Sequence, residues 1–178
     1  MSKKDFEFLE QHDFLVGEYI YDVEHRYAPA IGFFLISFSS FEHELNSAIA
    51  GYIHDRTDEP GLAITQMLSV RSKIELFHKL YIRLEAAKSN PSSNKEKLKN
   101  IYKRMIEINN FRNKIVHANW ISLQKGYTVR TKTTTDNENG YVKFERIKIL
   151  PSDIKKMTIK AEKMSEKIIS YMDGAFQF

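Results

Sequence analysis

The short segment RNKIVH, residues 112–117, holds three side chains that together could act on a phosphodiester. Arg112 carries a permanent positive charge on a planar guanidinium that fits phosphate oxygens. His117 can take up or release a proton near neutral pH, and Asn113 can hold either group by hydrogen bonds. On RNA, His117 would act on the 2′-hydroxyl or the leaving oxygen, while Arg112 would stabilise the charge that builds on the phosphate. The segment therefore predicts a site for RNA cleavage.

The spacing of these three residues limits how they can meet. Each residue of an α-helix turns by about 100°, so Asn113 and His117 face the same way, about 40° apart. Arg112 and His117 differ by about 140°, so a single helix does not direct both at one atom. Arg112 instead continues the apolar stripe of its helix, where an unpaired charge is unfavourable. Three interpretations stay open: an ion pair between Arg112 and Glu42, a site shared by two chains across a two-fold axis, or a network that only caps the helix.

Positive charge is concentrated after residue 60. The chain has 27 Lys and Arg against 23 Asp and Glu, yet residues 1–60 hold four of the basic residues and twelve of the acidic ones. Either these charges lie on solvated helix faces that balance in the folded protein, or they form a basic surface that attracts a polyanion such as nucleic acid. Four residues near the motif are predicted to contact RNA: Lys103, Arg104, Lys114 and Asn119.

The motif needs a helical framework to position it. Apolar residues recur every three or four positions over residues 5–27, 30–54, 70–87, 94–119 and 151–174. Residues 120–150 are rich in threonine, valine, isoleucine and tyrosine, which predicts two strands joined by a turn at Asn139-Gly140. The expected fold class is all-α, a single domain over residues 1–178. It is a bundle of about five helices, with an N-terminal helix within residues 1–28 and a β-hairpin at 120–150 inserted before the last helix.

Composition narrows the class of protein further. The chain has no cysteine, which excludes a disulfide framework and a thiolate metal site. The most apolar run, about residues 28–41, is too short to cross a bilayer, and no apolar signal-peptide region follows the first lysines. We therefore expect a cytoplasmic protein without a membrane partner.

A carboxylate-bridged metal site is the rival chemistry. Glu75 and His78 have the Glu-x-x-His spacing of helical di-iron proteins, and Asp22 with His25 forms a poor second copy. Asp22 stands where a glutamate is expected, and Lys79 follows His78 directly. These departures favour exposed polar residues on amphipathic helices, so no metal and no other cofactor is predicted.

The segment RNKIVH resembles the signature of the HEPN superfamily, in which an arginine and a polar residue precede a histidine. Arg112 matches the family arginine, Asn113 the polar residue and His117 the histidine. Two earlier segments, FEHELN at residues 41–46 and SKIELFHKL at residues 72–80, come in an order similar to that of HEPN domains. The resemblance extends over roughly residues 30–175, and the strand-rich insert before the last helix looks like one that the family tolerates.

The resemblance to HEPN proteins implies a homodimer in which two arginine–histidine motifs meet at the interface. Many members are metal-independent endoribonucleases of toxin–antitoxin, phage-defence or RNA-processing systems. The implied partners are a second copy of the chain, an RNA substrate and, for a toxin, an antitoxin protein. In one branch a tyrosine two residues after the histidine is modified, but Asn119 stands there, which argues against that regulation. Other members are inactive and bind protein or RNA, and such a binding module is the alternative function.

Overall fold

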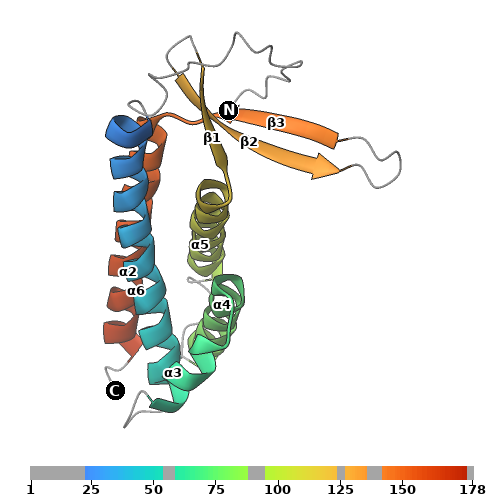
Figure 1. The fold of residues 1–178 in the computed structure, drawn as a ribbon. Coiled ribbons are helices and arrows are strands. Elements are labelled where there is room, and N and C mark those ends of the chain that lie inside the picture. Colours follow the sequence, from blue (N-terminus) through green and yellow to red (C-terminus); the bar gives the residue numbers. More distant parts are fainter. Residues whose placement is uncertain (1–22, 54–58, 88–94, 124–126, 136–141, 176–178) are drawn as a thin grey trace. The chain divides into compact units, whose positions relative to one another are not determined.

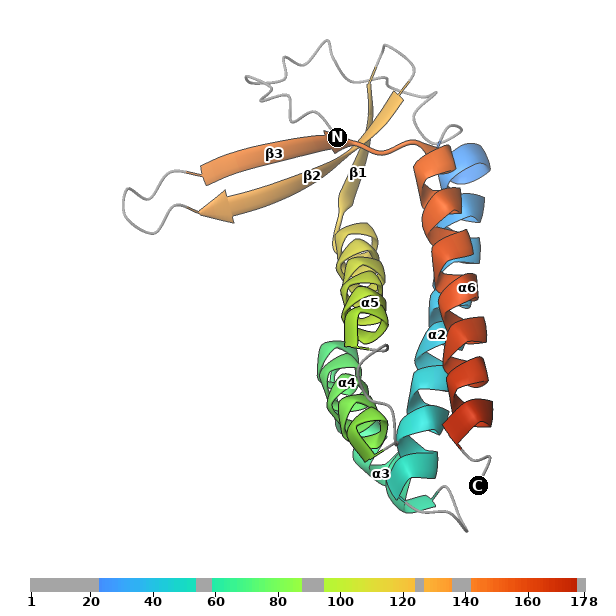
Figure 2. The same cartoon turned by 180° about the vertical axis from the view of Figure 1, so that it is seen from behind.

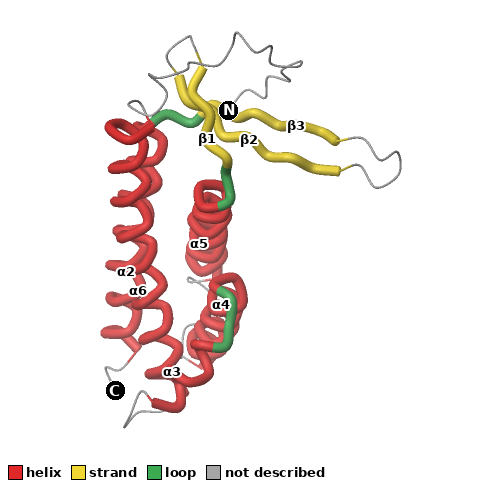
Figure 3. Tube along the Cα trace, viewed as in Figure 1, coloured by secondary structure: helices red, strands yellow, loops and turns green. Residues whose placement is uncertain are grey.

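The computed structural model describes residues 23–53, 59–87, 95–123, 127–135 and 142–175 (Figure 1). Helices predominate, and three strands separate the last two helices in the sequence (Figure 3). The elements in chain order are η2 (Val23–Tyr27, a π-helical turn), α2 (Ala28–Ile53), α3 (Glu59–Gln66), α4 (Val70–Ala87), α5 (Lys95–Val116), β1 (Asn119–Leu123), β2 (Tyr127–Thr135), β3 (Val142–Lys148) and α6 (Pro151–Ala175).

The predicted helical framework is confirmed in its coarse form, since the described residues contain five α-helices. The helix predicted at 70–87 has these same bounds in the structure, and those predicted at 30–54, 94–119 and 151–174 differ by up to three residues at either end. The short helix α3 lies between the helices predicted at 30–54 and 70–87 and was not predicted. The predicted helix at 5–27 lies mostly outside the described residues, as does the Asn139-Gly140 turn. No helix of the described ranges is long and apolar enough to span a bilayer.

The chain forms two compact units. The helical unit comprises Leu35–Arg112 and Met157–Phe178, and the sheet unit comprises Met1–Phe34 and Asn113–Lys156. Three helices pass from one unit to the other, because α2, α5 and α6 each contain a boundary.

Apolar stripes on four helices form the core of the helical unit. Their members recur at intervals of three or four residues, so each stripe occupies one helix face. When the protein folds, the four apolar faces are buried against one another. Within this unit α2 and α6 run side by side in both views (Figures 1 and 2). Their buried members include Phe38, Phe41, Leu45 and Ile49 on α2, Ile74, Phe77 and Tyr81 on α4, Leu98, Ile101, Met105 and Ile108 on α5, and Met157, Ala161, Met164 and Ile168 on α6.

Aromatic rings and one close backbone approach fix the neighbours of these helices. The ring centroid of Tyr81 on α4 lies 6.1 Å from that of Tyr52 on α2 and 5.1 Å from that of Tyr171 on α6. Gly61 of α3 lies against α2 so closely that an added Cβ would come within 2.3 Å of Cα of Ala50. Glycine is required at this position because it alone has no side chain to meet the neighbouring backbone.

The sheet unit contains a three-stranded antiparallel sheet of order β1-β2-β3. β1 pairs with β2 from Asn119 opposite Thr131 to Leu123 opposite Tyr127, and β2 pairs with β3 from Val129 opposite Lys148 onward. The sheet therefore has one strand more than the two that the sequence predicted, and the additional strand is β1. β1 was not predicted because it has only five residues and follows directly after α5, so its local pattern gave no separate strand signal.

Two further contacts of the sheet unit are a helix cap at the start of α6 and a pair of packed aromatic rings. The carboxylate of Asp153 accepts a hydrogen bond from the backbone N–H of Leu150 at 3.3 Å, which is half of a capping box at the start of α6. Pro151 follows as the first helical residue, where its missing N–H is not needed. The ring of Tyr27, which is 1% exposed, lies 5.6 Å from the ring of Trp120 between centroids.

Candidate functional site

Arg112 is the last residue of the helical unit and is half-buried on α5. Its Cζ atom lies 5.7 Å from the centroid of the Phe38 ring on α2. A guanidinium over an aromatic face gains from the ring's negative quadrupole, typically about 0.5–1 kcal/mol at a partly exposed position. The arginine that continues an apolar stripe is thus accommodated against a buried ring.

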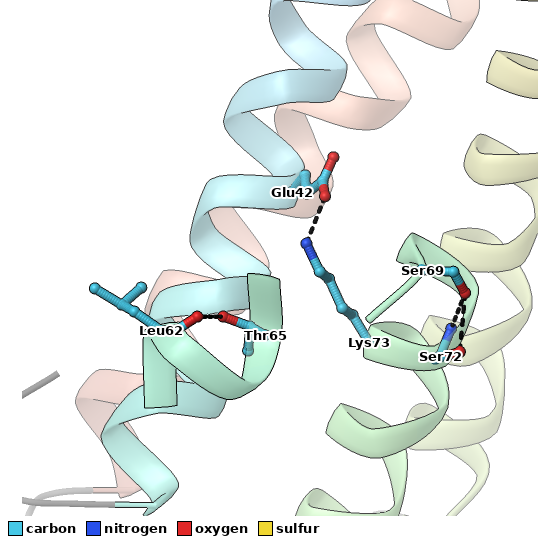
Figure 4. A network of polar contacts seen from close by, with 6 residues as sticks. All are labelled: Glu42, Leu62, Thr65, Ser69, Ser72 and Lys73. Atoms are coloured by element: carbon cyan, nitrogen blue, oxygen red, sulfur yellow. Dashed lines mark hydrogen bonds and ion pairs between the residues drawn. The ribbon is translucent and has the colours of Figure 1, made fainter. Parts of the chain in front are cut away.

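Glu42, which one of the three interpretations paired with Arg112, contacts another residue. Its Oε1 accepts a hydrogen bond from Nζ of Lys73 at 2.6 Å, joining α2 to α4 (Figure 4). Lys73 is 5% exposed, so this ion pair neutralises a buried ammonium. The ion pair of Glu42 is thus with Lys73, and the pairing with Arg112 stays one interpretation. The role of Lys73 as a buried ion-pair partner was not predicted, because a lysine four residues before Phe77 resembles any solvated residue beside an apolar stripe.

Asn113 and His117 belong to the sheet unit, and both are exposed. The backbone N–H of His117 donates to the carbonyl of Asn113 at 3.2 Å, so the helical hydrogen-bond pattern reaches His117, one residue past the end of α5. The two side chains therefore keep the four-residue spacing that places them on one face. An exposed imidazole beside an exposed amide is accessible to a substrate.

The residues predicted to contact RNA fall on two elements. Lys103 and Arg104 are exposed in the middle of α5, and Lys114 is exposed in its last turn. Asn119 begins β1 and lies opposite Thr131 in the register. Because Lys103, Arg104 and Lys114 are exposed, they are accessible to phosphates. These contacts stay predictions.

A charged pocket between α5 and α6 is lined mostly by residues that were not predicted as site residues. Its volume is about 320 Å³, and one predicted RNA contact, Arg104, forms part of its wall. The signal was available: Lys160, Lys163 and Lys167 follow one another at intervals of three and four residues, which places them on one face of α6. The lining residues are Arg104, Glu107, Lys160, Lys163, Met164 and Lys167.

Glu75 and His78, the candidate metal ligands, have other contacts. The carboxylate of Glu75 accepts a hydrogen bond from Arg71 at 3.1 Å. The ring of His78 lies 4.6 Å from the Tyr102 ring between centroids, and burial lowers the pKa of His78 because it disfavours the charged form. Within the described ranges, no three His, Asp or Glu side chains are grouped so that they could hold a metal ion.

In the motif, Asn113 and His117 are exposed and Arg112 lies against Phe38, and a role of these residues in RNA chemistry stays a prediction. No family model, curated protein or solved structure matches this chain.

Proposed function

We propose that the chain is a metal-independent endoribonuclease of the HEPN type that acts as a homodimer. The observation that carries the proposal is the exposure of Asn113 and His117 at the end of α5, directly after an arginine held against an aromatic ring. A titratable imidazole, a polar amide and a fixed cation are the groups that phosphodiester cleavage requires.

The proposed reaction uses the 2′-hydroxyl of the RNA as nucleophile. His117 accepts the proton of this hydroxyl, and the 2′-oxygen forms a bond to phosphorus. The bond from phosphorus to the 5′-oxygen breaks, and the leaving oxygen takes a proton from an imidazolium. Arg112 stabilises the negative charge that grows on the phosphate oxygens in the transition state. The products are a 2′,3′-cyclic phosphate and a 5′-hydroxyl, and no water is consumed in this step.

Dimerisation is part of the proposal because of the helical spacing. Arg112 and His117 differ by about 140° around one helix, so a second copy that contributes the same motif brings the missing group to the cleft. The proposal includes a role as a toxin or phage-defence effector, and for a toxin an antitoxin protein is the further partner. The exposed lysines near the motif would guide RNA toward the site.

Cleavage assays on purified protein test the proposal. Labelled RNA is incubated with the wild-type chain in EDTA, beside Arg112→Ala, His117→Ala and the control His43→Ala, which replaces an exposed histidine of α2. We expect cyclic-phosphate ends from the wild type and the control, and loss of cleavage by about 100-fold or more in both motif variants. Equal cleavage by His117→Ala would show that another nuclease is at work and reject the proposal.

A catalytically inactive dimer that binds protein or RNA is the second candidate. The contact between Arg112 and Phe38 favours it, since it gives the arginine a packing role that needs no substrate. Absence of cleavage on a broad set of RNAs, together with a dimer in light scattering and tight RNA or protein binding, would support this alternative. A strict monomer would contradict both candidates.

A further inference from the structure

The pocket between α5 and α6 of the helical unit is dominated by positive charge. Four of its six lining residues are cationic and one is acidic, which leaves an excess of three positive charges. All six residues belong to the helical unit, so the pocket is contained within one compact body. A hollow with such an excess favours an anion over a neutral or cationic ligand.

One ion pair crosses this pocket. Nζ of Lys160 on α6 lies 2.6 Å from Oε1 of Glu107 on α5, and each side chain is 50% exposed. A pair so open to water contributes little stability, so its main effect is to neutralise Lys160 and to place a carboxylate in the pocket. The described part of the chain contains no ion pair for Arg104, Lys163 or Lys167.

The cations of α6 form a row. Lys160 and Lys167 are seven residues apart, which is about 10 Å along a helix at about 1.5 Å per residue. Of the acidic residues in this helix segment, Glu162 accepts a hydrogen bond from Ser37, and Glu166 borders the row three residues after Lys163 but does not line the pocket. The row can therefore contact more than one phosphate of a strand whose charges recur at intervals on the order of 3–7 Å.

We propose that this pocket binds the phosphate backbone of single-stranded RNA. The identity of the ligand rests on the proposed function, whereas the charge of the pocket does not. Arg104 supplies a planar fork for phosphate oxygens, and the lysine row supplies regularly spaced point charges. A positively charged groove that follows the backbone is the common means of binding a single strand without reading its sequence. Glu107 opposes the ligand, so its removal strengthens binding.

Fluorescence anisotropy with a labelled single-stranded oligoribonucleotide tests this assignment. All variants carry His117→Ala and are measured in EDTA, so that cleavage does not interfere. Glu107→Gln removes the opposing carboxylate and frees Lys160. The charge-reversing pair Lys163→Glu with Lys167→Glu removes the row, and Lys79→Glu, an exposed position of α4 that does not line the pocket, is the matched control.

We expect the charge-reversed double variant to raise Kd by about tenfold or more relative to the Lys79→Glu control. Its salt dependence should become shallower by about 0.7 for each phosphate that the variant no longer neutralises, measured between about 50 and 200 mM salt. Glu107→Gln should lower Kd about threefold, a gain that misfolding cannot imitate. Should the double variant fail to fold by circular dichroism, Glu107→Gln alone decides the question.

The assignment is overturned if the double variant binds RNA as the control does, or if Glu107→Gln weakens binding. Loss of binding to an acidic peptide, with RNA binding unchanged, would also overturn it and assign the pocket to a protein partner. Failure of the proposed function can be distinguished from failure of this assignment. RNA binding that depends on Lys163 and Lys167, without cleavage by the wild-type chain, refutes the nuclease and leaves the assignment of the pocket standing.

Discussion

Nζ of Lys73 lies 2.6 Å from Oε1 of Glu42, and the two side chains are 6% and 31% exposed. The pair joins α4 to α2 inside the helical unit, and the two burial values are unequal. The ammonium has lost nearly all its water, while the carboxylate remains partly open to solvent. The consequences of removing either partner should therefore differ in size.

Glu42→Gln should destabilise the protein far more than Lys73→Met. The first change leaves a buried ammonium without its counter-charge, and we expect a loss of about 2–3 kcal/mol in the free energy of unfolding. The second removes the charge and keeps an unbranched side chain of similar length, so a loss below about 1 kcal/mol is expected. Urea unfolding measures both. Equal losses would mean that the pair is effectively solvated, contrary to its geometry.

Gly61→Ala should lower the free energy of unfolding by about 1–3 kcal/mol, because its Cβ would lie 2.3 Å from Cα and 2.6 Å from Cβ of Ala50. Backbone atoms cannot move aside as the end of a flexible side chain can, so α3 must shift. Gly32→Ala is the matched control in α2, where an added Cβ meets nothing within 4 Å. That variant should gain about 0.5–1 kcal/mol from helix propensity. Thermal unfolding of both variants checks the contrast, and a stable Gly61→Ala protein would refute the close approach.

The helices could be predicted because their apolar spacing is a local signal. The bounds of α4, Val70–Ala87, follow from its apolar period and from the sequence KSNPSSN after it, whose proline and serines disfavour a helix. The partner of a charged residue could not be predicted in the same way. Glu42 follows Leu35 and Phe38 at helical spacing in the sequence, but its pairing with Lys73, 31 positions away, depends on how α2 and α4 pack together.

The candidate site shows the same division between local and long-range information. The alignment of Asn113 with His117 follows from helical spacing, and the backbone hydrogen bond between them agrees with it. The packing of Arg112 on Phe38 depends on the approach of α5 to α2, which no local pattern contains. Strand β1 was not predicted for a related reason, since it is recognisable only through its pairing with β2.

Replacement of His78 should flatten the dependence of stability on pH. Burial lowers the pKa of His78 from its usual value of 6.5, so the unfolded chain takes up this proton before the folded chain does. The contribution of His78 is therefore neutral above about pH 6.5 and becomes destabilising as pH falls below it. His78→Phe keeps a ring against Tyr102, and its melting temperature should fall less than that of the wild type between about pH 7.5 and about pH 5. His43→Gln, an exposed histidine variant, is the control, and a wild-type slope in His78→Phe would disprove the assignment.

Stability measurements on the motif separate a helix cap from a site. Arg112→Ala should lower the free energy of unfolding by about 1 kcal/mol, because it removes the guanidinium from the Phe38 ring and the packing of the arginine stem. His117→Ala should change it by less than about 0.5 kcal/mol, since the imidazole is exposed past the end of α5. Urea unfolding of both variants gives these values. A loss in His117→Ala as large as in Arg112→Ala would identify the histidine as part of a capping network. Unchanged stability together with abolished RNA cleavage would leave chemistry as the role of His117, because a side chain that does not support the fold cannot abolish activity through the fold.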